Sequence, residues 1–83
     1  MVQVYFTAES RKIFESIREK KTKDKITQAL IKLSQNPHAG KKLHGKLKET
    51  YSLRVWPYRI LYEFTKEKNI MITDIGHRRE IYR

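Results

Sequence analysis

Two runs of alternating apolar and polar residues, at 51–55 and 58–64, lie on either side of a Trp56-Pro57 turn. Alternation with a period of two, carried by β-branched and aromatic residues, is typical of strands that have one covered face. A third apolar run, 70–75, comes after the polar turn 66–69 and can pair beside the second. These runs predict a three-stranded antiparallel meander, which needs an apolar cover on one side.

The N-terminal residues predict a strand followed by an amphipathic helix. Residues 2–6 alternate apolar and polar, and Thr7 after them is a good N-cap residue. Apolar residues then recur on one helical face, and these are Ile13, Phe14 and Ile17. We expect this first helix to end near Lys21.

A second amphipathic helix is expected from Asp24, which can cap its N-terminus, to about Asn36, because Pro37 comes next. Its apolar positions have the i, i+3, i+4, i+7 spacing and are Ile26, Ala29, Leu30 and Leu33. Only residues 20–23 would separate the two helices, so we expect an antiparallel hairpin whose shared apolar stripe covers the sheet.

The expected fold is therefore α+β, in the order β-α-α-β-β-β, with a helical hairpin packed on one face of a small, mainly antiparallel sheet. Residues 1–83 are expected to form a single domain, because a chain this short can build one modest core. The sequence contains no Cys, so packing has to hold the fold together. Without a long apolar stretch or a signal-peptide pattern, we expect a cytoplasmic protein with no membrane partner.

The charge balance narrows the class of partner. The chain has 19 Lys and Arg against 9 Asp and Glu, a formal net charge of +10. Such an excess favours a polyanionic partner, with nucleic acid first among them. A positive solvated surface that only maintains solubility is the alternative, since charge alone names no reaction.

Strand alternation predicts two arginines on the uncovered face of the sheet. The side chains expected to face the helices are Leu53, Val55, Ile60, Tyr62 and Phe64, and those expected to face away are Ser52, Arg54, Arg59 and Glu63. The tail 77–83, after Gly76, would return beside these strands, so we expect one cleft to hold the arginines and the tail. Four lysines before the hairpin can line its rim, and these are Lys41, Lys42, Lys46 and Lys48.

A cluster of this kind suits cleavage of a phosphodiester. Guanidinium groups bind non-bridging phosphate oxygens and stabilise the charge that grows in the transition state. RNA carries its own nucleophile, the 2′-OH, so a base and an acid complete the reaction. His77 and Tyr82 are the candidates for these proton transfers, Tyr82 as a base only if neighbouring arginines favour its charged form.

Other polar and aromatic residues receive no catalytic role. His38 and His44 lie in a loop rich in Pro, Gly and Lys and are interpreted as surface residues. Trp56 and Tyr58 at the hairpin turn can either stack on a base or pack structurally. Neither a metal-ligand spacing nor a glycine loop for a nucleotide is found in the sequence, so we expect no metal and no cofactor.

Three blocks of residues resemble the signature of RelE-type toxins in the RelE/ParE superfamily. The blocks are Leu53-Arg54-Val55, Tyr58-Arg59-Ile60-Leu61-Tyr62-Glu63 and Ile75-Gly76-His77-Arg78-Arg79-Glu80-Ile81-Tyr82-Arg83. They occur in the family's order, and the Lys42-Leu43-X-Gly45 element before them also fits. The resemblance implies the toxin of a type II toxin-antitoxin system: an mRNA interferase that cuts mRNA, often on the translating ribosome, leaves a 2′,3′-cyclic phosphate and is neutralised by a cognate antitoxin protein.

The resemblance also implies roles for individual residues. Carried over by position, the catalytic residues would be Arg54, Arg59, Arg78 and Tyr82, with His77 where other members have a basic residue or a histidine. From their charge and position, and apart from the resemblance, the expected further RNA contacts are Lys41, Lys42, Lys46, Lys48, Arg79 and Arg83. One departure is Ser52, which stands where some members have one of two paired lysines; Lys46 or Lys48 can compensate.

Two other functions stay open for the same fold. A ParE-like gyrase poison would act by binding a protein and would need none of these side chains for acid-base chemistry. A non-catalytic RNA-binding or ribosome-binding module would use the positive surface for phosphate contacts alone.

Overall fold

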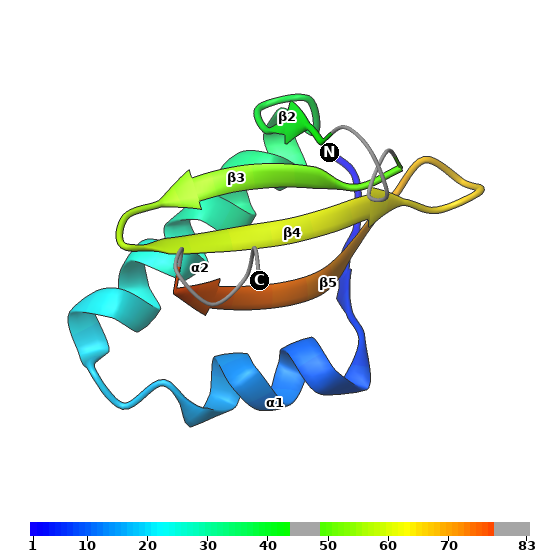
Figure 1. The fold of residues 1–83 in the computed structure, drawn as a ribbon. Coiled ribbons are helices and arrows are strands. Elements are labelled where there is room, and N and C mark those ends of the chain that lie inside the picture. The colour runs from blue at the N-terminus through cyan, green and yellow to red at the C-terminus, as the bar shows by residue number, and fades with distance from the viewer. Residues whose placement is uncertain (44–48, 78–83) are drawn as a thin grey trace.

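The computed structural model describes residues 1–43 and 49–77, which form two helices packed on one side of a five-stranded sheet (Figure 1). The elements are, in order, β1 (Val4–Phe6), α1 (Ala8–Ser16), α2 (Lys20–Gln35), β2 (Lys41–Lys42), β3 (Tyr51–Val55), β4 (Tyr58–Phe64) and β5 (Ile70–His77). The expected α+β class, with helices on one face of a mainly antiparallel sheet, is confirmed. Neither of the described helices is long and apolar enough to cross a membrane.

The sheet has the strand order β1-β5-β4-β3-β2. Strand β1 runs parallel to β5, and every other neighbouring pair is antiparallel. The two-residue edge strand β2 was not expected, because so short a segment carries no periodic signal. It extends the sheet beyond β3 and places Lys41 and Lys42 beside the hairpin.

The boundary between the helices lies earlier in the chain than predicted. Helix α1 ends at Ser16 and α2 begins at Lys20, so the residues expected to form the link are the first turn of α2. Ile17 leaves the helical conformation, with φ −69° and ψ 117°, while its side chain stays packed against the core. Glu19, and not Asp24, is the N-cap of α2, and the Thr22 hydroxyl donates a hydrogen bond to its carboxylate.

The start of α1 agrees with the sequence pattern. The Thr7 side chain accepts a hydrogen bond from the backbone N–H of Ser10, so Thr7 is the N-cap, as predicted. Ser10 itself is fully buried, and its hydroxyl donates to the carbonyl oxygen of Ile72 at 2.7 Å. This bond ties the first turn of α1 to β5.

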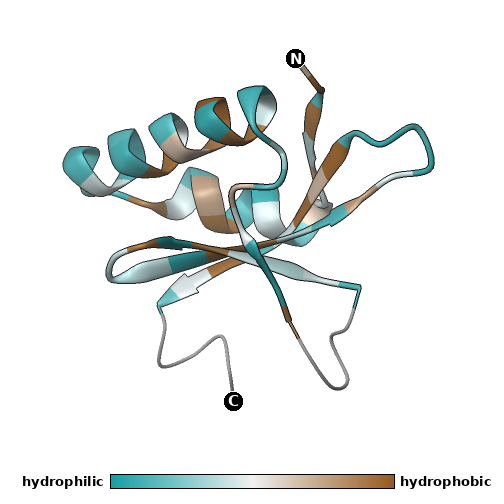
Figure 2. Cartoon of the chain, turned by 90° about the horizontal axis from the view of Figure 1, so that it is seen from above, coloured by the Kyte–Doolittle hydropathy of each residue, from teal (hydrophilic) through white to brown (hydrophobic). Residues whose placement is uncertain are grey.

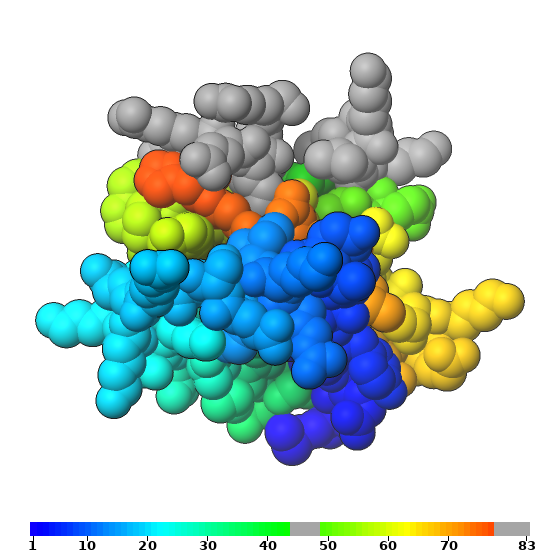
Figure 3. All heavy atoms as spheres, turned by 90° about the horizontal axis from the view of Figure 1, so that it is seen from below, coloured from blue at the N-terminus to red at the C-terminus, as the bar shows by residue number. Residues whose placement is uncertain are grey.

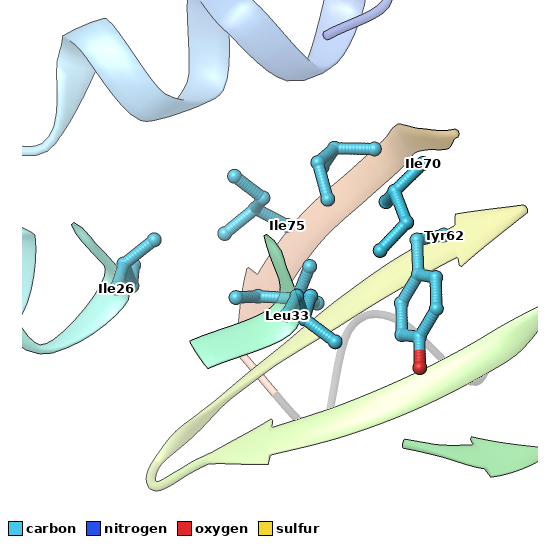
Figure 4. Close-up of a cluster of buried hydrophobic side chains, with 7 residues drawn as sticks. Ile26, Leu33, Tyr62, Ile70 and Ile75 are labelled. Atoms are coloured by element: carbon cyan, nitrogen blue, oxygen red, sulfur yellow. The ribbon is translucent and has the colours of Figure 1, made fainter. Parts of the chain in front are cut away.

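The core lies between the helices and the sheet (Figure 4). Its fully or almost fully buried members are Ile26, Leu33, Ile60, Tyr62, Ile70, Ile72 and Ile75. Ile26 and Leu33 come from one face of α2, as the helical spacing predicted, and each buried side chain of this size contributes about 1.5–3 kcal/mol. Figure 2 shows both helices as one layer over the sheet, which leaves the opposite sheet face free of helices.

Candidate functional site

Arg54 and Arg59 are direct neighbours across the β3–β4 hairpin. The register pairs Arg54 with Arg59 and, one residue further in, Leu53 with Ile60. Because Ile60 is fully buried beneath the helices, alternation along the strand places both arginines on the uncovered face. Side chains directly opposite each other have Cβ atoms about 4.5–5.5 Å apart, so the structure brings the two arginines together as expected.

The two arginines line a hollow of about 640 Å³ between β2 and the hairpin. The other described residues around it are Ala39, Lys41, Lys42, Leu43, Ser52 and Leu53, and no acidic residue is among them. Lys41 pairs with Ser52, so its side chain leaves the sheet on the arginine face, whereas Lys42 pairs with Tyr51 on the helix side. The cationic hollow, as we call this site, therefore has Lys41, Arg54 and Arg59 as its charged side chains on the face opposite the helices, among the residues described, and Lys42 also lies at its wall.

The two arginines differ in burial. Arg54 is exposed on β3, whereas Arg59 is half-buried on β4, between two neighbouring strands. On the β5 side, the residue opposite Arg59 is Gly76, so β5 contributes no side chain at this position. Arg59 is therefore the less solvent-exposed of the two arginines.

Like charges placed directly opposite each other destabilise a sheet. Two guanidinium groups on neighbouring strands, with Lys41 on the same face, create a local positive field that an anion relieves. Guanidinium forks match phosphate oxygens in geometry as well as in charge. The arrangement is suited to a phosphate group.

His77 lies apart from the arginines, so the prediction that it shares their cleft is wrong. Its register partner is Tyr58, and the two rings meet edge to face with centroids 6.0 Å apart. Both line a second hollow of about 450 Å³ on the helix side, next to the end of α1. Figure 3 shows the end of β5 beside the β3–β4 turn and above α1. The reason is that β5 continues beyond the expected end near Ile75, so alternation carries His77 to the face opposite Arg59.

Several predicted site residues lie outside the described part of the chain. They are Arg78, Arg79, Tyr82 and Arg83 in the tail, and Lys46 and Lys48 before the hairpin. Of the residues given no role, His38 is exposed and its ring lies against Phe64, with centroids 5.3 Å apart. Trp56 is 57% exposed at the hairpin turn.

Sequence reasoning did not find all of the hollow. Ala39 and Leu43 line it on either side of the short strand β2, and Ser52 forms part of its wall. Nothing in the residue types at 39 and 43 indicates a site, because they reach it only through the pairing of β2 with β3. Ser52 was predicted to face this side but was considered only as a missing lysine.

The comparison with protein families identifies the family of the chain. The model for the ParE toxin of the type II toxin-antitoxin system parDE matches residues 4–82. The chain belongs to this toxin family. The toxin is thereby a member of the RelE/ParE superfamily, and solved structures of RelE toxins share its fold, as the predicted resemblance implies. No curated protein sequence gives a significant match.

Solved structures show the same fold as the toxin. A chain of the toxin-antitoxin complex RelBE2 from Mycobacterium tuberculosis is 28% identical, with a TM-score of 0.72 over 93% of this chain and 98% of that one. The isolated RelE toxin of E. coli is 21% identical, with a TM-score of 0.76 over 93% and 84% of the two chains. A chain of the archaeal RelE-RelB complex from Pyrococcus horikoshii is 22% identical, with a TM-score of 0.76 over 95% and 97%.

Proposed function

We propose that the toxin is an endoribonuclease that cleaves mRNA without a metal ion, by attack of the RNA 2′-OH on the adjacent phosphate. The observation that supports this most is the direct pairing of Arg54 with Arg59 on the uncovered face, beside Lys41 in one hollow. A phosphodiester in that hollow would meet two guanidinium forks and an ammonium group. The net charge of +10 favours the approach of RNA to this surface.

In the proposed reaction, the 2′ oxygen forms a bond to phosphorus while the bond from phosphorus to the 5′ oxygen breaks. The products are a 2′,3′-cyclic phosphate and a free 5′-OH. Negative charge grows on the non-bridging oxygens, where Arg59 and Arg54 stabilise it. The proton of the 2′-OH passes to a base, and an acid protonates the leaving 5′ oxygen.

The candidates for the two proton transfers are His77 and Tyr82. His77 receives no such role in this proposal, because its side chain lies on the other sheet face, against Tyr58. Tyr82 and Arg78, which lie outside the described residues, are proposed for proton transfer and for a further phosphate contact on the resemblance alone. Their positive charge and their position in the chain support Arg79, Arg83, Lys46 and Lys48 as additional RNA contacts.

We also propose a cognate antitoxin as the protein partner and the translating ribosome as the place of cleavage. Both the RelBE2 and the archaeal RelE-RelB neighbours are chains of toxin-antitoxin complexes, which supports the antitoxin as partner. The ribosome offers mRNA surrounded by further phosphate, which suits a strongly basic toxin.

Primer extension on a defined mRNA, with and without ribosomes, tests the reaction. Arg59→Ala is expected to slow cleavage by about 10²-fold, the loss typical of removing one transition-state donor. Arg59→Lys should recover little, because an ammonium group cannot form the bidentate fork. Arg11→Ala is the matched control: Arg11 lies on α1, pairs with Glu15 and is far from the hollow in the fold. The proposal fails if the wild-type toxin cuts under neither condition, or if Arg59→Ala cuts as fast as Arg11→Ala.

A gyrase inhibitor is the second candidate, because the matching family model is that of the ParE toxin. Such a toxin acts through protein binding, and its effect would not depend on a phosphate-binding pair. A supercoiling assay with purified gyrase separates the two. Inhibition that is equal for the wild type and Arg59→Ala, without RNA cleavage, would favour this candidate over the ribonuclease.

A further inference from the structure

Tyr62 connects the buried core with the backbone that leads into the cationic hollow. Tyr62 is fully buried, and Figure 4 shows its ring among the core side chains. The hydroxyl nevertheless makes two hydrogen bonds to main-chain groups outside the sheet. It donates to the carbonyl oxygen of Pro37 at 3.0 Å and accepts from the N–H of Gly40 at 3.0 Å.

The backbone at Gly40 passes very close to this hydroxyl. A Cβ atom at position 40 would lie 2.5 Å from the Tyr62 Oη and 2.9 Å from the backbone oxygen of Ser52. Both distances are too short for a side-chain carbon, so only glycine fits without a shift. The segment 37–40 is therefore confined between the Tyr62 side chain and strand β3.

The residues directly after Gly40 form the charged wall of the hollow. Lys41 and Lys42 make only two register pairs with β3, and the N–H of Leu43 donates to the Thr50 carbonyl at 2.8 Å. A pairing this short is weak by itself. Its position depends on how the chain is held just before it, where the Tyr62 hydroxyl binds.

We infer that the Tyr62 hydroxyl is a positioning group for RNA binding, because it holds residues 37–40 so that Lys41 faces the hollow with Arg54 and Arg59. This inference rests on the proposed function and names a residue outside the hollow that the function depends on. Tyr62 does not line the hollow among the described residues and acts through Lys41.

The protonation state of the hydroxyl suits this task. Burial raises the pKa of Tyr62, more than the hydrogen bond from Gly40 lowers it, and the nearby Tyr51 raises it further. The phenol therefore keeps its proton in neutral solution and continues to donate to Pro37. Tyr51 stacks on the Tyr62 ring, with centroids 5.6 Å apart, and provides a neighbouring tyrosine for comparison.

The test uses Tyr62→Phe, which removes one oxygen and keeps the ring that fills the core. Affinity is measured for a single-stranded RNA with 2′-O-methyl riboses, which lacks the attacking hydroxyl, over a series of salt concentrations. Affinity falls as the salt concentration rises, and each phosphate contact to a single strand makes the slope of log affinity against log salt more negative by about 0.7. Lys41→Ala should make this negative slope shallower by about 0.7, and Tyr62→Phe should make it shallower by a similar amount.

A double variant separates positioning from general loosening. If Tyr62 acts through Lys41, Tyr62→Phe in the Lys41→Ala background should cause no further loss of slope. Tyr51→Phe is the matched control and should keep the wild-type slope. Gly40→Ala disturbs the contact between Gly40 and the Tyr62 hydroxyl from the backbone side, and it should make the slope shallower, as Tyr62→Phe does. All variants are compared well below their melting temperatures, with folding checked by circular dichroism.

The outcomes are distinct. A wild-type slope and affinity in folded Tyr62→Phe, with normal binding by the wild type, overturns the inference alone. Additive losses in the double variant also overturn it, because Tyr62 would then act independently of Lys41. A wild-type toxin that does not bind the free RNA overturns this inference; if it also cuts mRNA neither with nor without ribosomes, the proposed function is overturned as well.

Discussion

Replacing Arg54 with glutamine should stabilise the toxin while it weakens RNA binding. Arg54 and Arg59 face each other directly on the uncovered side of the sheet, and like charges in this position repel. Glutamine keeps most of the length of the exposed Arg54 side chain and removes its charge. Such opposite effects, higher stability and weaker binding, are expected when two like charges lie side by side to bind a ligand.

The magnitude can be worked out from the geometry. Cβ atoms of opposite residues lie about 4.5–5.5 Å apart, and long side chains diverge from there, so a charge separation of about 7 Å is reasonable. Two unit charges at about 7 Å in water repel by about 0.6 kcal/mol. With a urea slope of about 1–3 kcal/mol/M, the unfolding midpoint of Arg54→Gln should rise by about 0.2–0.6 M.

Urea unfolding at low and high salt is the appropriate assay, because urea leaves the ionic strength unchanged. The Debye length falls to about 3 Å at about 1 M salt, so the gain in stability should disappear there. Lys66→Gln is the matched control: Lys66 is exposed in the turn between β4 and β5, and its replacement lowers the net charge of +10 equally. An equal gain in both variants, or a gain that high salt does not reduce, would refute cross-strand repulsion as the cause.

Three further predictions concern stability. Leu33→Ala removes a fully buried side chain of α2 and should cost about 2–5 kcal/mol by urea unfolding, whereas Ile31→Ala, at a position 45% exposed on the same helix, should change stability far less. Ser10→Ala breaks the buried bond to the Ile72 carbonyl and should cost about 1–3 kcal/mol; an unchanged melting temperature would count against a structural role for that bond. The third prediction is a pH dependence. Because the pKa of Tyr62 is raised in the folded state, its contribution to stability is complete below the unfolded value of about 10 and is lost as pH rises through the folded pKa. Unfolding measured on both sides of about pH 10 should therefore show a steeper loss for the wild type than for Tyr62→Phe, and parallel curves would contradict the prediction.

Patterns between near neighbours in the chain were sufficient to predict the class of fold and which side chains of each helix and strand face the core. Helical spacing placed Ile26 and Leu33 in the core, and Thr7 marked the start of α1. Strand alternation was enough to place Arg54 and Arg59 on the uncovered face. These features are local, because the geometry of a helix or strand repeats within a few residues, so the order of residue types already contains them.

Contacts between distant segments decided the rest. The opposition of Arg54 to Arg59 depends on the register of the hairpin, and the length of β5 turned His77 away from them. Strand β2 exists only because β3 offers it a partner, and Gly40 is held by a hydroxyl 22 residues further along the chain. Such arrangements are set by which surfaces fit and which hydrogen bonds form when the layers pack. No local pattern encodes them, because the partner that selects each conformation is brought near only by the completed fold.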